Sequence, residues 1–115
     1  NCSAWKIVIE VENIADLGGL HIAYDAMQKS FEQNGYPEPI DRFTAEQRFF
    51  LGYAQVWRQN IRDNELMRRL KEDVHSPGRF RVNGPVRNMH EFYEAFDIKA
   101  EMTLYIPPEK RAQIW

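Results

Sequence analysis

The sequence predicts a mainly α-helical fold: a small domain of about four helices with one short N-terminal strand or extended arm. Apolar residues recur at helical intervals in several segments, capping sequences precede two of them, and β-branched residues gather near the N-terminus. A length of 115 residues fits one domain, and 43% hydrophobic residues can form a modest core.

The N-terminal segment differs in composition from the rest of the chain. Residues 5–11, Trp-Lys-Ile-Val-Ile-Glu-Val, are rich in β-branched residues and favour a short strand or extended arm. We therefore divide the chain into an arm of uncertain origin, residues 1–11, and a helical portion, residues 12–115. A helix is predicted from Glu12 to about Asn34, with Gly35 just beyond its end. Its apolar stripe comprises Ile14, Leu17, Leu20, Tyr24, Met27 and Phe31.

Two more helices are predicted after Gly35. Thr44-Ala45-Glu46-Gln47 matches a capping box and opens a helix rich in aromatic residues. A shorter helix begins near Asp63. The charged residues around it are typical of a solvated, ion-paired face.

Turn-forming residues dominate the rest. Residues 74–86 are predicted to form a loop with one extended piece at 80–82. Asn88 and Glu91 match a capping box for a last helix. The tail is expected to turn at Pro107 and to end in a short helical segment that closes on Trp115.

Composition limits the classes of function. The net charge is −2 and the charges of both signs are interleaved, so no basic tract indicates nucleic-acid binding. No apolar run approaches the roughly 20 residues of a membrane span. The single cysteine, Cys2, allows no internal disulfide, which fits a reducing compartment or a bacterial protein that does not rely on disulfides. The compartment itself, cytoplasmic or extracytoplasmic, is left undecided.

Several residues are candidates for a functional site. Glu12 and Asp16 lie four residues apart at a helix start and so share one face. His75 and Arg81 flank a Gly/Pro turn, and Trp57 lies in the aromatic helix, which is predicted to continue to Ile61. Taken singly, these are first-turn acids, a loop histidine, a surface arginine and a core tryptophan. Together they are components of a zinc hydrolase site, although the chain contains no His-Glu-x-x-His segment.

Three strings in order carry a family resemblance. They are Glu-Asn-Ile-Ala-Asp-Leu-Gly-Gly-Leu at 12–20, Phe-Phe-Leu-Gly-Tyr-Ala-Gln-Val-Trp at 49–57, and Asp-Val-His-Ser-Pro-Gly-Arg-Phe-Arg-Val-Asn-Gly at 73–84. They resemble the neprilysin family of zinc metalloendopeptidases, in its endothelin-converting-enzyme-like, bacterial form. The resemblance covers residues 12–115 and corresponds to the last portion of the catalytic domain. Ala112 stands where animal relatives carry a cysteine, which favours a bacterial-type member.

The resemblance implies a role for each candidate. Glu12 matches the third zinc ligand, which joins two histidines of the His-Glu-x-x-His helix. Asp16 matches the acid that orients a zinc-bound histidine. His75 matches the residue that stabilises the oxyanion of the tetrahedral intermediate. Arg81 matches the arginine that binds the peptide backbone just after the scissile bond, and Trp57 resembles a wall of the adjacent apolar pocket.

The missing segment sets the functional expectation. Without both histidine ligands and the general base, we expect this chain to bind no zinc and to be inactive alone. It is then a C-terminal fragment of a zinc metalloendopeptidase that cleaves on the amino side of apolar residues. The alternative is a non-catalytic helical remnant or binding module of that family. The expected partners are a peptide substrate, the missing N-terminal part of the catalytic domain, and a second copy in a symmetric dimer.

Overall fold

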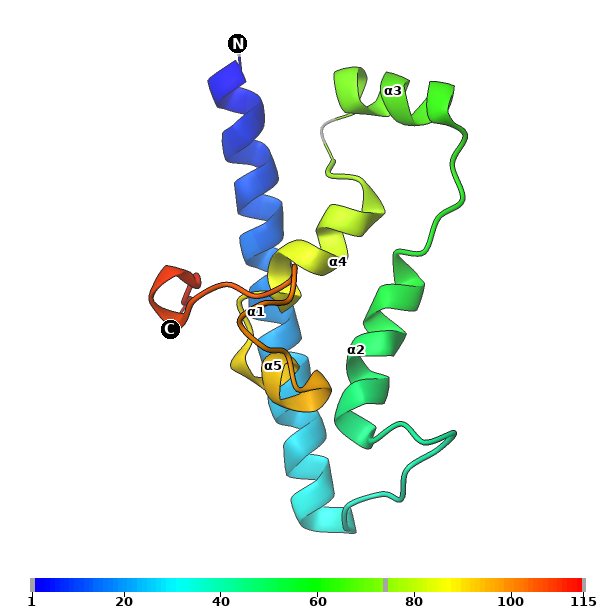
Figure 1. Ribbon diagram of the computed structural model, residues 1–115, viewed down its shortest axis with the longest axis vertical. Coiled ribbons are helices and arrows are strands. Elements are labelled where there is room, and N and C mark those ends of the chain that lie inside the picture. Colours follow the sequence, from blue (N-terminus) through cyan, green and yellow to red (C-terminus); the bar gives the residue numbers. More distant parts are fainter. Residues whose placement is uncertain (1, 74, 115) are drawn as a thin grey trace.

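The computed structural model describes residues 2–73 and 75–114, and for residues 2–10 it describes the backbone alone. Within those residues the chain forms helices and no β-strand, so the prediction of a mainly α-helical fold is confirmed (Figure 1). Val74 and the closing Trp115 lie outside the described residues. The elements are α1 (Cys2–Asn34), α2 (Ala45–Val56), α3 (Asp63–Glu72), α4 (Gly78–Val86), α5 (His90–Phe96) and the 3-10 turn η1 (Pro108–Lys110).

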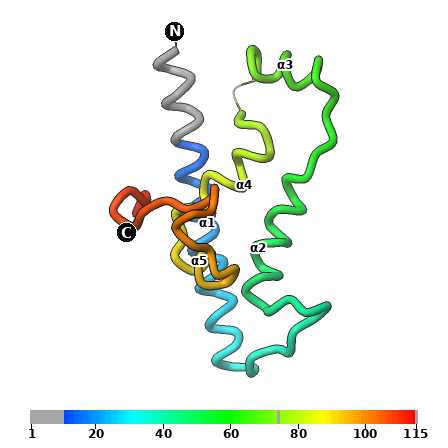
Figure 2. The backbone as a smooth tube through the Cα atoms, in the orientation of Figure 1, coloured from blue at the N-terminus to red at the C-terminus, as the bar shows by residue number. Residues whose placement is uncertain are grey.

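Helix α4 lies at the centre of the arrangement, between the long helix α1 and α2. The tube in Figure 2 follows the chain down α1, back along α2, across α3 and down α4 between α1 and α2. Helix α4 packs against both α1 and α2, while α5 packs against α2. None of the described helices combines the length and the apolar character that crossing a membrane requires.

The core lies where α1, α2 and α5 meet. Phe50 is 3% exposed, and its ring stacks on Tyr24 of α1 at 5.9 Å and meets Phe92 of α5 edge-on at 5.5 Å. Such aromatic pairs stabilise a fold by about 0.5–1.5 kcal/mol beyond the area that they bury. The buried cluster comprises Leu17, Leu20, Tyr24, Phe50, Val86, Met89, Phe92 and Tyr93.

Two of the predicted helix ends are confirmed and one predicted cap is wrong. Thr44 and Gln47 form the reciprocal capping box of α2, and Gly35 has the left-handed φ of 89° typical of a residue just beyond a helix. At α5, however, the N-cap is Met89, with no side-chain cap. The side chain of Asn88 instead donates to the Gly84 carbonyl and accepts from the Ala112 N–H, so it ties α4 to the C-terminal tail.

The predicted N-terminal strand is wrong, because residues 5–11 belong to α1. β-branched residues prefer strands chiefly when a neighbouring strand and a packed face are available. A strand there would have no partner among the described residues, whereas a helix satisfies its backbone groups within its own segment.

The predicted loop over residues 74–86 is also wrong, because most of it forms α4. Gly78 and Pro85 favour a loop locally, yet both lie in the helix. Pro85 has no N–H to donate to the carbonyl four residues earlier, that of Arg81. The hydroxyl of Tyr53 donates to this carbonyl at 2.8 Å instead. A side chain of α2 thus supplies the hydrogen bond that the proline removes.

The start of α4 lies directly against the end of α2. A Cβ atom added to Gly78 would lie 2.4 Å from the backbone oxygen of Trp57. This separation is far below van der Waals contact, so only glycine allows the approach.

We therefore expect Gly78→Ala to lower the free energy of unfolding by about 1–3 kcal/mol, because the backbone must shift to relieve the overlap. Gly84→Ala in the same helix is the matched control, since its Cβ would meet only the Asn13 side chain, at 3.6 Å. Urea denaturation of both variants measures the difference. Equal free energies of unfolding for the two variants would contradict the close approach of Gly78 to the Trp57 carbonyl.

Candidate functional site

Four of the five predicted site residues line one cavity of about 440 Å³. Glu12 comes from α1, Trp57 from the end of α2, His75 from the loop before α4, and Arg81 from α4. Asp16, one turn after Glu12, lies beside the cavity and binds Arg81. The structure thus brings together residues that lie far apart in the sequence, from Glu12 to Arg81.

The ion pair between Arg81 and Asp16 joins α4 to α1. Arg81 Nε donates to Asp16 Oδ2 at 2.5 Å, and Nη2 donates to Oδ1 at 3.0 Å. The two side chains are only 11% and 17% exposed. This two-pronged pairing with Asp16 raises the pKa of Arg81. The guanidinium is therefore held in one orientation and stays charged.

Two aromatic residues at the end of α2 contact Arg81, one at its guanidinium and one at its backbone carbonyl. Arg81 Cζ lies 4.2 Å from the centre of the Trp57 ring, a cation–π geometry. Burial, together with the nearby carboxylate of Asp16, raises the pKa of Tyr53 to about 12. Tyr53 therefore remains a neutral hydroxyl donor to the Arg81 carbonyl across the ordinary pH range.

The two carboxylate oxygens of Glu12 have different surroundings. Oε1 lies 3.4 Å from both Arg81 Nη1 and His75 Nε2. Oε2 is buried and has no hydrogen-bond partner among the described residues. A buried carboxylate oxygen without a partner is energetically costly, so such an atom in a cavity wall is suited to receiving a cation or a donor from outside the chain.

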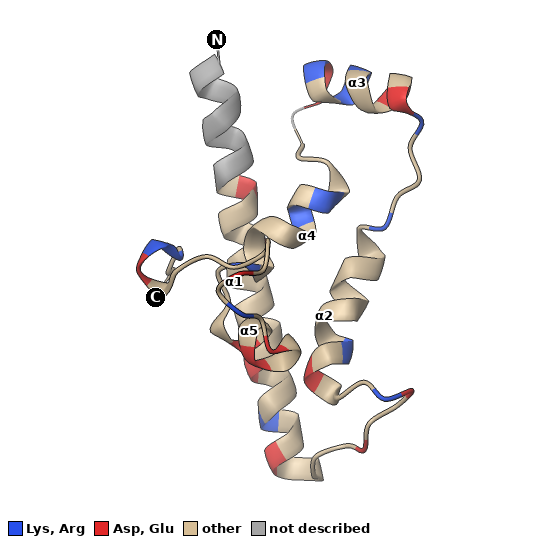
Figure 3. Ribbon diagram, in the orientation of Figure 1, with Lys and Arg blue, Asp and Glu red and all other residues tan. Residues whose placement is uncertain are grey.

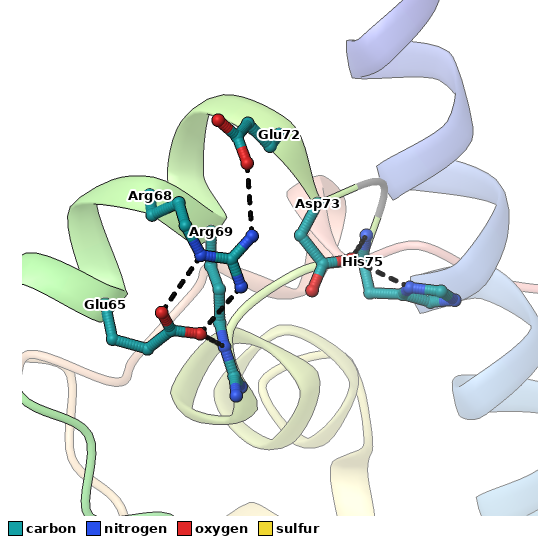
Figure 4. A network of polar contacts seen from close by, with 6 residues as sticks. All are labelled: Glu65, Arg68, Arg69, Glu72, Asp73 and His75. Carbon is teal, nitrogen blue, oxygen red and sulfur yellow. Dashed lines mark hydrogen bonds and ion pairs between the residues drawn. The ribbon is translucent and has the colours of Figure 1, made fainter.

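His75 is positioned by Asp73, a residue that the sequence analysis missed. Asp73 Oδ1 accepts the backbone N–H of His75 at 3.0 Å and lies 2.9 Å from ring atom Nδ1 (Figure 4). These two contacts lower the pKa of Asp73. With Nδ1 engaged, Nε2 is the ring nitrogen on the side of Glu12. The Asp-x-His spacing in the sequence was the available signal.

The side chains that could ligate a metal can be compared with the number and type of ligands that zinc takes. Zinc in catalytic sites takes three protein ligands, commonly histidine nitrogen and carboxylate oxygen. No group of three or more His, Cys, Asp or Glu side chains in residues 2–73 and 75–114 could hold a metal ion. Both oxygens of Asp16 are bound by Arg81. The unpaired oxygen of Glu12 fits one ligand of such a site, and the described residues supply no set of three.

Comparison with known proteins identifies the relatives of this chain. The family model "Peptidase family M13" matches residues 4–112, so the match includes most of the segment that the sequence analysis left outside the family resemblance. Human neprilysin is 42% identical over 106 residues, which is 90% of this chain and 14% of that protein. Human membrane metallo-endopeptidase-like 1 is 36% identical over the same share of this chain and 13% of its own length.

Solved structures agree. The zinc metalloprotease ZMP1 of Mycobacterium tuberculosis, solved by cryo-electron microscopy in an open state, superposes with a TM-score of 0.82 at 50% identity. Its crystal structure in complex with an inhibitor gives a TM-score of 0.80 at 51% identity. Each match covers 90% of this chain and 16% of the other, so the chain spans a small part of its relatives. The chain therefore belongs to peptidase family M13, the neprilysin family.

Proposed function

We propose that this chain is the C-terminal portion of the catalytic domain of a zinc metalloendopeptidase that cleaves peptides on the amino side of apolar residues. One observation carries the proposal: Glu12, Trp57, His75 and Arg81 line a single cavity, and Asp16 holds Arg81 in place. Membership of peptidase family M13 supports it.

Arg81 and Trp57 are the residues that bind substrate. The fixed guanidinium of Arg81 presents N–H donors suited to a peptide carbonyl just after the scissile bond. The ring of Trp57, together with Ile61 and Leu66, gives the cavity an apolar wall. Such a wall favours an apolar side chain at the residue that follows the cleaved bond.

His75 stabilises the charge that develops during the reaction. A protonated imidazole donates from both ring nitrogens. Nδ1 then donates to Asp73, and Nε2, the ring nitrogen on the side of Glu12, is the donor for the oxygen that becomes negative when water attacks the carbonyl. Asp73 acts as a positioning residue, because its carboxylate contacts both the backbone N–H and the ring Nδ1 of His75.

Glu12 provides one zinc ligand, through the buried oxygen that lacks a partner among the described residues. Zinc bound there would supply a water of lowered pKa and a Lewis acid for the peptide carbonyl. Because one carboxylate does not hold zinc usefully, the remaining ligands and the general base must come from a segment outside these residues. The chain alone is then inactive.

We expect His75→Ala in the complete enzyme to lower kcat by about 100- to 1000-fold with little change in KM, since the donor acts on the transition state. Asp73→Asn should lower kcat less. His90→Ala is the control, because His90 lies on α5 and pairs only with Glu94 among the described residues. A rise in KM with unchanged kcat would assign His75 to ground-state binding instead.

Arg81→Lys should lower kcat/KM by about tenfold or more, because lysine keeps the charge but loses the planar fork that spans Asp16. The loss should appear mainly in KM. Arg79→Lys, an exposed position on the same helix, should leave both constants unchanged. Steady-state kinetics on one fluorogenic peptide compares the two variants. Equal effects at both positions would show that α4 contributes only charge.

We expect the purified chain to contain no stoichiometric zinc and to show no peptidase turnover. In the complete enzyme, Glu12→Gln should release the metal while the protein stays folded. Elemental analysis and circular dichroism test both expectations. Stoichiometric zinc and turnover by this chain alone would overturn the assignment of Glu12 as a lone ligand.

A further inference from the structure

Helix α4 contains no carboxylate that could hold Arg81. Its charged residues are Arg79 and Arg81, both in its first half and both basic (Figure 3). The groups that position Arg81 therefore come from other helices. Asp16 of α1 binds the guanidinium, and Tyr53 of α2 donates its hydroxyl to the backbone carbonyl at 2.8 Å.

These two contacts restrain different parts of Arg81. The ion pair with Asp16 fixes the forked end of a long, flexible side chain. By itself it would still allow α4 to shift, because other rotamers of the side chain could compensate. The Tyr53 hydroxyl bonds to the backbone, so it fixes the point where the side chain begins. With both ends held, the guanidinium is ordered before a ligand arrives, which reduces the entropy lost on binding.

Pro85 makes the contact from Tyr53 necessary. In a regular α-helix the Arg81 carbonyl would accept the N–H of residue 85. Pro85 has no N–H, and a proline ring crowds the carbonyl four residues earlier. The side chain of Pro85 is fully buried, so it is enclosed by neighbouring groups. The Arg81 carbonyl therefore takes a donor from outside α4, and the Tyr53 hydroxyl is that donor.

Tyr93 offers a comparison, because its hydroxyl also bonds to the backbone near the end of α4. It donates to the Arg87 carbonyl at 2.7 Å and accepts the Ile106 N–H at 2.9 Å. Tyr93 is more deeply buried than Tyr53. Its partners belong to the C-terminal part of the fold and not to the residues that line the cavity. Tyr93 thus supports the fold, whereas Tyr53 bonds directly to a site residue.

We infer that Tyr53 is a positioning residue for peptide binding, which acts through the backbone of Arg81 and is required because Pro85 removes the helical hydrogen bond there. This inference rests on the proposed function, in which Arg81 binds the backbone of the substrate. Tyr53 is not among the residues that line the cavity, so it acts through Arg81 and not on the peptide itself. Its effect is therefore expected in substrate binding, not in the chemical step.

Tyr53→Phe tests the inference, because it removes the hydroxyl and keeps the ring. In the complete enzyme we expect KM for a fluorogenic peptide to rise about three- to tenfold with little change in kcat, the effect of one lost hydrogen bond on binding. Tyr93→Phe is the matched control, which should lower the free energy of unfolding and leave KM unchanged. An unchanged KM in Tyr53→Phe, or an equal rise in both variants, would contradict the inference.

A second substitution separates positioning from general stability. Pro85→Val introduces a backbone N–H at position 85 with a side chain of similar size, so the Arg81 carbonyl gains a donor within the helix. In the Pro85→Val background, Tyr53→Phe should change KM by no more than about twofold, because the two donors serve the same acceptor and their effects are not additive. The same rise in KM with and without Pro85→Val would show that Tyr53 acts by another route.

The outcome can be separated from that of the proposed function. An unmodified complete enzyme that cleaves no peptide would count against the proposed function. The positioning of Arg81 is then measured without substrate, from the nuclear magnetic resonance order parameter of its Nε–H in this chain. Tyr53→Phe should lower that order parameter, and the double variant Tyr53→Phe/Pro85→Val should restore it. An order parameter that Tyr53→Phe leaves unchanged would overturn the inference.

Discussion

The ion pair between Arg81 and Asp16 is the contact on which the site depends. It joins α4 to α1 through two hydrogen bonds in a region where both side chains are largely buried. Removing one partner would leave the other charge buried without compensation, which is more costly than never having the pair. The same guanidinium lies over Trp57 of α2 and 3.4 Å from Glu12. One side chain therefore sets the relative positions of three helices at the cavity.

The backbone of α4 also helps to hold Arg81 in its position at the cavity. Because Pro85 has no N–H, the Arg81 carbonyl lacks its hydrogen bond within the helix. The Tyr53 hydroxyl donates to this carbonyl instead. Gly78 lets the first turn of α4 approach the Trp57 carbonyl to a distance that any side chain would prevent. Gly78 and Pro85 would weaken an isolated helix, yet here they allow the contacts that hold α4 against α2. Arg81 is held at its carbonyl by Tyr53 and at its guanidinium by Asp16, so its position depends little on the flexibility of a long side chain.

These two features also explain what the sequence could and could not predict. The apolar stripe of α1, the end at Gly35 and the capping box at Thr44 are local signals, and all three can be recognised from neighbouring residues. Helix α4 was missed because its glycine and proline favour a loop locally, and only contacts with α1 and α2 make it helical. The strand predicted at 5–11 failed for a similar reason, since strand propensity needs a partner strand. The site residues were recognisable as a set through family resemblance, whereas spacing alone left each of them ambiguous. Asp73 escaped notice because its role depends on a loop geometry that brings its carboxylate to both N–H groups of His75.

The residues that line the cavity differ in whether their polar groups have partners within this chain. The residues proposed to bind the peptide are fully supported within this chain: Arg81 by Asp16, Tyr53 and Trp57, and His75 by Asp73. Glu12 differs, because one of its oxygens is buried with no partner among the described residues. Such an atom is tolerated in a folded protein when a group from elsewhere compensates it. Under the proposed function, the residues that orient the substrate are therefore held in place by contacts within this chain, above all the ion pair between Arg81 and Asp16. Under the proposed function, zinc would take ligands from two segments, so the metal would also join this portion to the remainder of the catalytic domain.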